Sequence, residues 1–137
     1  MTLFVDSSTF YAGADRGDGS HRRAAQILSA EEPMVTSDHV LIETWLLLNA
    51  RLGYSAAERF WEGMRSGVAR VEPVERGDLE RAWSMGQDFP DQSFSIIDRT
   101  SFAVMLRLGV LRVASFDNDF LVFRHGRRRE RAFDVVR

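Results

Sequence analysis

The sequence predicts an α/β fold in which a short parallel β-sheet is flanked by helices on both faces. Short apolar segments with strand composition alternate with longer segments of helical periodicity, an order typical of strand–helix–strand units. Such units have right-handed crossovers and therefore make parallel sheets. The chain has 137 residues, which fits one domain with a substantial buried core. We expect a single domain that spans residues 1–137.

Five short segments are predicted to be strands. The first, Leu3–Val5, is an apolar run that ends at Asp6-Ser7-Ser8, a sequence with the composition of a helix cap. The remaining strands are expected at residues 34–36, 68–71, 110–114 and 133–136.

Helical periodicity and helix-end signals predict the helices between these strands. The strongest helix covers residues 39–52, because Ser37 supplies an N-cap and Gly53 a stop. Gly109 likewise ends a helix that covers residues 95–108. Further helices are expected at residues 21–30, 55–65 and 78–85.

The composition excludes several classes of protein. There is no cysteine, so the chain has neither disulfides nor thiolate metal sites. Oxygen or imidazole ligands must hold any metal ion, which favours Mg²⁺, Mn²⁺ or Ca²⁺ over Zn²⁺. All 18 basic residues are arginines, which excludes a P-loop nucleotide site and a receiver domain, because both require a lysine.

The apolar segments are short. The run at Leu3–Val5 is too short for the core of a signal peptide, and no run approaches the roughly 18 residues of a membrane span. We therefore expect a cytoplasmic protein that has no membrane partner.

The charges are unevenly distributed along the chain. Residues 1–98 carry 9 arginines against 16 acidic residues, a balance of −7, and residues 99–137 carry 9 against 4, a balance of +5. The two sum to the formal net charge of −2. An acidic site beside a basic surface suits a metal-dependent nuclease, and a solvated arginine-rich tail is the alternative explanation.

Two acidic residues follow strands directly. Asp6 comes after the first predicted strand and Asp117 after the fourth. Ligands in open α/β sheets gather beyond the carboxyl ends of the strands, so both side chains share a crevice if these strands are neighbours. N-capping of the next helix is the alternative role for Asp6, and a turn or cap is the alternative for Asp117.

Two further acidic residues lie in helices. Glu43 lies in an otherwise almost wholly apolar segment and has no arginine three or four residues away, so a metal ion or a distant arginine must compensate its charge. Asp98 follows Ser95 at capping-box spacing, and the pattern alone favours a capping role there.

Together these segments resemble the PIN-domain family and, within it, the VapC-type toxins of bacterial toxin–antitoxin pairs. The likeness extends over nearly the whole chain, in order and with similar spacing. The matching motifs are Val5-Asp6-Ser7-Ser8, Glu43 in its apolar helix, Asp91-x-x-Phe94-Ser95-x-x-Asp98, and Ser115-x-Asp117-x-x-Phe120.

The resemblance implies a metal-dependent endoribonuclease that uses Mg²⁺ or Mn²⁺. The four acidic positions of the family fall on Asp6, Glu43, Asp98 and Asp117, which would hold the metal and carry catalysis. Asp117 is preferred over Asp119 as the fourth acid because Phe120 then matches the family's aromatic position. Four residues are expected to support the site: Ser7, Asp91, Ser115 (where threonine is more usual) and Asp119.

The resemblance also implies partners, namely an RNA substrate, a small cognate antitoxin and a second copy of the chain in a homodimer. Apolar helices around Trp45 and Trp61 are one candidate for the dimer interface, although a core position is the stronger expectation for both tryptophans. The three histidines, His21, His39 and His125, are expected at the surface or in helix caps. The arginines of residues 124–131 suit contacts with RNA phosphates or with an acidic stretch of an antitoxin.

Three other functions compete with this one. A PIN-domain ribonuclease of RNA processing, without an antitoxin, would share every residue named above. A magnesium-dependent phosphatase usually needs Asp-x-Asp directly after the first strand, yet Asp6 is followed by Ser7 and Ser8. A non-catalytic RNA- or protein-binding PIN module is the third, and the presence of all four acids argues against it.

Overall fold

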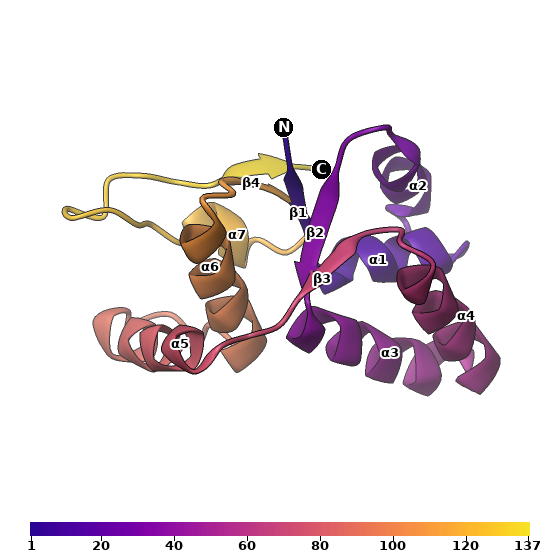
Figure 1. Ribbon diagram of the computed structural model, residues 1–137, viewed down its shortest axis with the longest axis horizontal. Helices are drawn as coiled ribbons and strands as arrows, with labels where there is room; N and C mark the ends of the chain where they lie inside the picture. Colours follow the sequence, from indigo (N-terminus) through magenta and orange to yellow (C-terminus); the bar gives the residue numbers. More distant parts are fainter.

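The structure, a computed structural model, describes residues 1–137 and contains one five-stranded sheet (Figure 1). The strand order is β3-β2-β1-β4-β5 and every pairing is parallel, which confirms the predicted α/β class. The strands are β1 (Leu3–Val5), β2 (Met34–Ser37), β3 (Arg70–Glu72), β4 (Arg112–Ala114) and β5 (Asp134–Val136).

Seven helices connect the strands. Figure 1 shows α5 and α6 on one side of the sheet and α1, α2 and α4 on the other, so both faces are covered as expected. None of the helices is both long enough and apolar enough to cross a membrane. The helices are α1 (Ser7–Ala14), α2 (His21–Ser29), α3 (Asp38–Leu52), α4 (Tyr54–Arg65), α5 (Arg76–Asp88), α6 (Ile96–Leu108) and α7 (Asp119–Val122).

Local chemistry explains where the main helices begin and end. The Ser37 hydroxyl accepts the Val40 N–H at the start of α3, as the sequence predicts. Gly109 ends α6 in the left-handed conformation at φ 69°, a region that a residue without a Cβ enters at little cost. Helix α5 begins before the predicted residue 78 because the Asp78 carboxylate accepts the Glu75 N–H at 2.9 Å.

Strand β1 lies at the centre of the sheet, between β2 and β4. Its residues Leu3, Phe4 and Val5 are at most 1% exposed, as an apolar run buried on both faces must be. Val5 is in register with Ala114, so β1 and β4 end side by side at the carboxyl edge of the sheet. This shared edge positions the residues that follow the two strands.

An aromatic cluster fixes the C-terminal third of the chain to α6. Phe102 is completely buried, and its ring lies 4.2 Å from that of Phe123 and 5.1 Å from that of Phe120, measured between centroids. Phe133 joins the cluster with centroid distances of 5.9 Å to Phe102 and 5.6 Å to Phe123. The cluster therefore holds α7 and the segment after it against the core.

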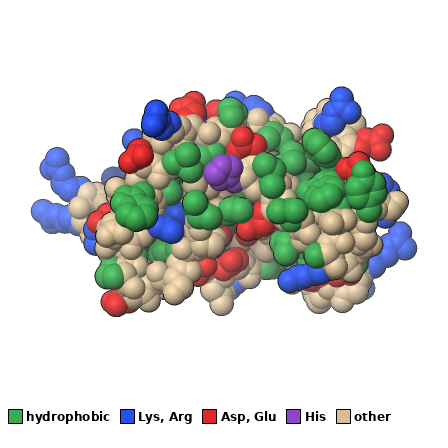
Figure 2. Space-filling model, turned by 90° about the horizontal axis from the view of Figure 1, so that it is seen from below, with side chains coloured by type: hydrophobic (Ala, Val, Ile, Leu, Met, Phe, Trp, Pro, Cys, Tyr) green, Lys and Arg blue, Asp and Glu red, His purple; other side chains and the backbone are tan.

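Several large apolar side chains lie outside the core, on the face that α3 and α5 form (Figure 2). The core position expected for Trp61 is wrong, since this side chain is 46% exposed, whereas Trp45 is half-buried. Both tryptophans line an apolar hollow of about 240 Å³ between α3 and α4. Other exposed apolar residues are Ile42 and Leu46 of α3 and Leu79 and Trp83 of α5.

The aromatic cluster predicts a large effect of truncation. Phe102→Ala should lower the free energy of unfolding by about 3–5 kcal/mol, because it removes a fully buried ring and leaves a cavity. Chemical denaturation monitored by circular dichroism measures this change. The control Trp83→Ala, at a side chain that is 67% exposed, should change stability by about 0.5 kcal/mol or less. Equal effects of the two substitutions would contradict the role given to the cluster.

Candidate active site

The residues that follow β1 and β4 meet at the carboxyl edge of the sheet. The Asp6 N–H donates to the Ala114 carbonyl at 3.0 Å, which continues the β1–β4 ladder by one residue. One step further, the Ser115 hydroxyl donates to the Asp6 carboxylate at 2.8 Å. The first and fourth strands of the sequence are thus neighbours, which is the condition under which Asp6 and Asp117 share a crevice.

Asp6 is buried and bound by hydroxyl groups. It is 2% exposed, and its Oδ2 accepts hydrogen bonds from Ser8 and Ser115, each at 2.8 Å. It occupies the N-cap position of α1, but its side chain accepts no helix N–H, so the capping role is wrong. Burial raises the pKa of Asp6, the hydroxyl hydrogen bonds oppose that rise, and the charge of Asp117 adds to it.

Glu43 reaches the same site from α3. The Ser7 hydroxyl donates a short hydrogen bond to Glu43 Oε1 and lies 3.5 Å from Asp6 Oδ1, so Ser7 links the two acids. Glu43 is half-buried. Burial raises the pKa of Glu43, and the charges of Asp6 and Asp117 add to the rise, while the Ser7 hydrogen bond opposes it. No arginine supplies the compensating charge that the sequence left as one possibility.

Three aspartates form the other half of the site. Asp98, Asp117 and Asp119 each contribute a carboxylate oxygen to a group whose members all lie within 4.8 Å of one another. The turn after β4 presents two of them: the Asp117 N–H donates to Ser115 Oγ at 3.0 Å, and Asp117 Oδ1 accepts the Asp119 N–H at 2.9 Å. Asp98 comes from the first turn of α6.

Only one of the two hydrogen bonds of the capping box predicted at Ser95 and Asp98 is present. Ser95 Oγ accepts the Asp98 N–H at 3.0 Å, but the Asp98 carboxylate makes no reciprocal bond to the Ser95 backbone. It approaches Asp119 instead. Burial, this contact with Asp119 and the charges of Asp6, Asp117 and Asp119 raise the pKa of Asp98 to about 9.

The site therefore holds five carboxylates rather than four. Asp119, which was predicted to have a supporting role, lies with Asp98 and Asp117 in the same group of carboxylates. The Asp-x-Asp spacing was the signal for it, although that spacing is also common in turns. Asp91, by contrast, is exposed in the loop between α5 and α6, and no hydrogen bond or ion pair joins it to the cluster.

The donor set suits a hard divalent cation. None of the five carboxylates has an arginine or histidine partner within 4.0 Å, so no basic side chain offsets their mutual repulsion. Oxygen donors alone, with neither sulfur nor imidazole among them, are the ligands that Mg²⁺ and Mn²⁺ prefer. The residues present thus fit such an ion.

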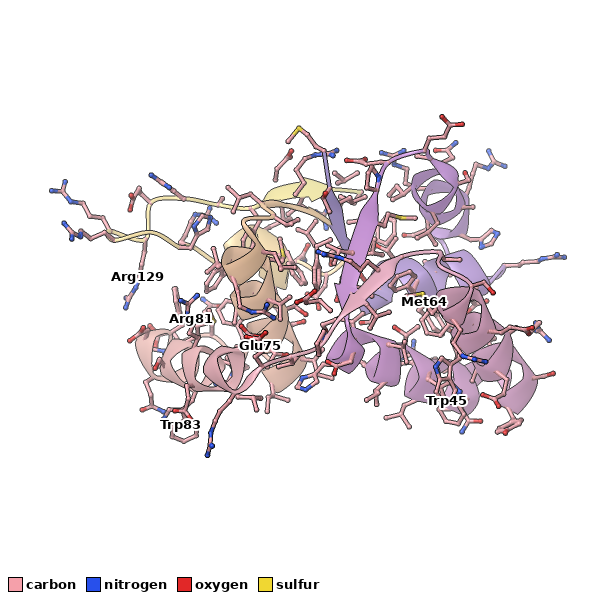
Figure 3. The ribbon with its side chains drawn as sticks, in the orientation of Figure 1. Trp45, Met64, Glu75, Arg81, Trp83 and Arg129 are labelled. Atoms are coloured by element: carbon pink, nitrogen blue, oxygen red, sulfur yellow. The ribbon has the colours of Figure 1, made fainter.

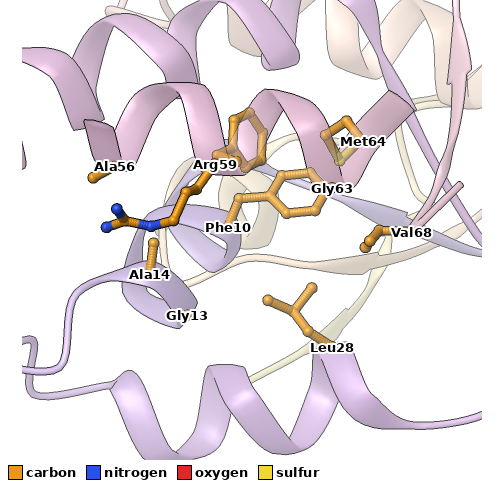
Figure 4. Close-up of a pocket in the computed structure, with 10 residues that line it drawn as sticks. Phe10, Gly13, Ala14, Leu28, Ala56, Arg59, Gly63, Met64 and Val68 are labelled. Atoms are coloured by element: carbon orange, nitrogen blue, oxygen red, sulfur yellow. The ribbon is translucent and has the colours of Figure 1, made fainter. Parts of the chain in front are cut away.

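A groove of about 430 Å³ adjoins the acidic cluster. Glu43, Leu47 and Arg51 succeed one another along α3 on one wall, and Ser7, Ser8 and Tyr11 of α1 are on the other. The Arg51 guanidinium lies 5.0 Å from the centroid of the Tyr11 ring. A different cavity, of about 310 Å³ between α1, α2 and α4, has mostly apolar walls and contains no carboxylate (Figure 4).

The histidines lie outside the cluster. His21 Nδ1 contacts the Ala12 carbonyl at 2.8 Å and His39 Nδ1 contacts the Thr100 hydroxyl at 3.2 Å. The surface position expected for His125 is wrong, because its ring is buried and stacked on Phe133 with centroids 5.1 Å apart. Burial lowers the pKa of His125.

Known proteins are similar to this chain in sequence and in fold. The PIN domain family model matches residues 3–125. The 23S rRNA-specific endonuclease VapC20 of Mycobacterium tuberculosis is 40% identical over 119 residues, which are 86% of this chain and 91% of that protein.

Two solved structures are also similar. A crystal structure of Mycobacterium tuberculosis VapC20, described as a sarcin-ricin loop cleaving toxin, matches with a TM-score of 0.83 and 38% identity over 88% of this chain and 93% of that one. A toxin–antitoxin complex from Klebsiella pneumoniae matches with a TM-score of 0.63 and 18% identity over 98% and 96%, a likeness of fold.

The raised pKa of Asp98 predicts how stability depends on pH when a chelator is present. The folded pKa of about 9 lies above the ordinary value of 3.8, so between these values the folded state keeps a proton that the unfolded state releases. The free energy of unfolding therefore falls as pH rises through this interval. Asp98→Asn removes the titrating group and should raise Tm at pH 8 by roughly 4 °C or more.

Thermal denaturation at pH 5 and pH 8 in EDTA measures this difference. The control Asp134→Asn changes an exposed aspartate at the sheet edge and should follow the wild type at both pH values. Wild type and Asp98→Asn losing stability in parallel between pH 5 and pH 8 would contradict the prediction.

Proposed function

The chain belongs to the PIN-domain family and to its VapC-type toxin endoribonucleases, and from this premise we propose that its five clustered carboxylates cleave RNA with a bound divalent cation. One observation carries the proposal. Asp98, Asp117 and Asp119 cluster together, and the Ser7 and Ser115 hydroxyls join Glu43 and Asp6 to the same site. None of the five has a cationic partner, and burial among like charges raises the pKa of Asp98 to about 9. A cation at this position removes the repulsion.

The proposed cation is Mg²⁺ or Mn²⁺, with Asp6, Glu43, Asp98 and Asp117 as its principal ligands, directly or through water. Asp119 completes the set from the same turn as Asp117. When bound, the ion supplies positive charge that acidifies an attacking water and stabilises the charge that develops on the phosphate. The proton held by Asp98 must leave for the ion to bind, so ion binding strengthens as pH rises.

The serine hydroxyls hold the carboxylates in place. Ser115 and Ser8 both donate to Asp6 Oδ2, which keeps the buried carboxylate oriented and favours its ionised form. Ser7 fixes Glu43 in the same way. Such supporting hydrogen bonds set the direction of ligand oxygens and their affinity for the ion.

The groove beside the cluster is the proposed path of the RNA strand. Glu43 and Arg51 are eight residues apart on α3, about 12 Å along the helix axis at 1.5 Å per residue. A strand in the groove therefore meets carboxylates at one end and a guanidinium suited to phosphate at the other. The VapC20 relative is named as acting on 23S rRNA, which supports ribosomal RNA as the substrate class.

The proposed partners follow from the family and from the surface. A small antitoxin is proposed as the cognate partner in the cytoplasm, with residues 1–137 acting as one domain. A second copy of the chain is proposed to cover the exposed apolar residues of α3 and α5, because several large apolar side chains exposed on one face are typical of an interface.

Cleavage of RNA by the purified protein tests the proposal. Wild type should cleave a 23S rRNA fragment with Mg²⁺ or Mn²⁺, and EDTA should abolish cleavage. Asp98→Asn should reduce kcat/KM by about 100-fold or more, because several kcal/mol of transition-state stabilisation depend on the ion. The control Asp134→Asn should cleave at the wild-type rate. Cleavage that survives EDTA would rule out the proposed mechanism.

The hydroxyl at position 115 gives a second prediction. Ser115→Ala removes the hydrogen bond to Asp6 and should weaken Mn²⁺ binding by about 10–100-fold, measured by calorimetry. Ser115→Thr keeps the hydroxyl and should bind Mn²⁺ within a few-fold of wild type. Unchanged affinity in the alanine variant would show that Ser115 does not orient a ligand.

A further inference from the structure

A protruding segment with five arginines lies between α7 and β5. Residues 124–131, named here the arginine hairpin, turn back on themselves through an antiparallel pair in which the His125 N–H donates to the Arg131 carbonyl at 2.9 Å and the Arg131 N–H to the His125 carbonyl at 3.1 Å. Gly126 and Arg129 have φ angles of 92° and 54°. The turn is thus a defined structure, in which a non-glycine residue holds the left-handed conformation.

Two of the arginines fasten the hairpin to the body of the protein. Arg129 lies with its guanidinium 5.1 Å from the centroid of Phe89 and 3.5 Å from the Asp88 carboxylate. Arg124 donates to the carbonyls of residues 121–123 at the end of α7. His125 stacks on Phe133 and so attaches the base of the hairpin to the aromatic cluster. Figure 3, in which Arg129 is labelled, shows the hairpin projecting past α6 on the side of the sheet where α5 lies.

The other three arginines have no acidic partner. Arg127, Arg128 and Arg131 are exposed, and no carboxylate lies within 4.0 Å of their guanidinium groups. Glu130, the one acid of the hairpin, accepts the Arg128 backbone N–H at 2.9 Å. Five arginines against one glutamate give the hairpin a net charge of +4. A polyanion relieves this repulsion and gains affinity through counterion release.

We propose that the arginine hairpin is a second RNA-binding surface that holds phosphates of the substrate at a distance from the cleaved bond. The inference rests on the proposed ribonuclease function and extends it. Arg127 follows Asp119 by eight residues, so their Cα atoms are at most about 29 Å apart. This reach spans up to several base pairs of an RNA duplex beside the cleavage site.

The composition of the hairpin favours RNA over a protein partner. Residues 124–131 contain no large aliphatic or aromatic side chain apart from the buried His125, whereas the exposed apolar residues of α3, α4 and α5 lie on a different face. Guanidinium groups suit bidentate contacts with phosphate. The family model also ends at residue 125, so the tip of the hairpin lies outside the part of the chain that the family model matches.

The experiment compares the paired variants R127Q/R128Q and R22Q/R23Q, which remove equal charge from the hairpin and from the exposed side of α2. The cleavage site is first mapped on a 23S rRNA fragment. Two substrates are then made, a stem-loop that contains the site with ten base pairs of stem and a single-stranded hexanucleotide centred on it. R127Q/R128Q should raise KM about tenfold on the stem-loop at unchanged kcat and leave cleavage of the hexanucleotide unchanged.

A binding measurement in the Asp98→Asn background separates the hairpin from catalysis. The logarithm of the affinity for the stem-loop decreases with the logarithm of the salt concentration. In R127Q/R128Q the magnitude of this negative slope should be smaller by about 1.4–1.8, because two phosphate contacts are lost. The control R22Q/R23Q should have the wild-type KM and the wild-type salt dependence of affinity. All variants should have the same Tm.

Two outcomes would overturn the inference. One is an R127Q/R128Q protein that binds and cleaves the stem-loop as the α2 control does. The other is unchanged binding and cleavage of the stem-loop by R127Q/R128Q together with weaker binding of the antitoxin to this variant, which would assign the hairpin to an acidic protein partner. If wild type cleaves no RNA, the proposed function fails, and the salt slope in the binding measurement still decides the role of the hairpin.

Discussion

The repulsion among five carboxylates is the constraint on which the rest of the structure depends. Asp6 and Asp98 are buried, and Glu43, Asp117 and Asp119 are partly buried around them at the carboxyl edge of the sheet. The β1–β4 pairing brings Asp6 beside the turn of Asp117, and Phe120 anchors that turn in the core. The stability of the core therefore offsets a local repulsion, which the proton on Asp98 reduces and which a bound cation would neutralise.

Much of the site follows from the sequence because strand ends in a parallel sheet have a common direction. Once Leu3–Val5 and residues 110–114 are identified as strands, Asp6 and Asp117 must lie at the same edge if the strands are adjacent. The sequence left the adjacency of these strands as a condition, since periodicity says nothing about strand order, and the β1–β4 pairing meets it. The Ser7–Glu43 contact depends on how α3 crosses this edge, which is a tertiary property that no local pattern encodes.

Three features of the structure were not predicted from the sequence, and each has a physical reason. Helix α7 has four residues, too few to show helical periodicity, and it carries Asp119 into contact with Asp98. His125 is polar by composition, yet stacking on Phe133 buries it. Trp61 is apolar by composition, yet the hollow between α3 and α4 leaves it half exposed. For His125 and Trp61, tertiary packing overrides the preference of the individual residue, whereas α7 is simply too short for a local pattern to show it.

The aromatic cluster connects the two proposed RNA contacts mechanically. Phe120 directly follows Asp119, Phe123 directly precedes Arg124, and both rings pack on Phe102 of α6. Helix α6 also supplies Asp98, so the carboxylates and the arginine hairpin are both attached to α6. Because the distance between the acidic cluster and the arginine hairpin is fixed, the protein would select RNA by the shape of its backbone rather than by its bases. This is the way that proteins distinguish folded RNA from an unstructured strand.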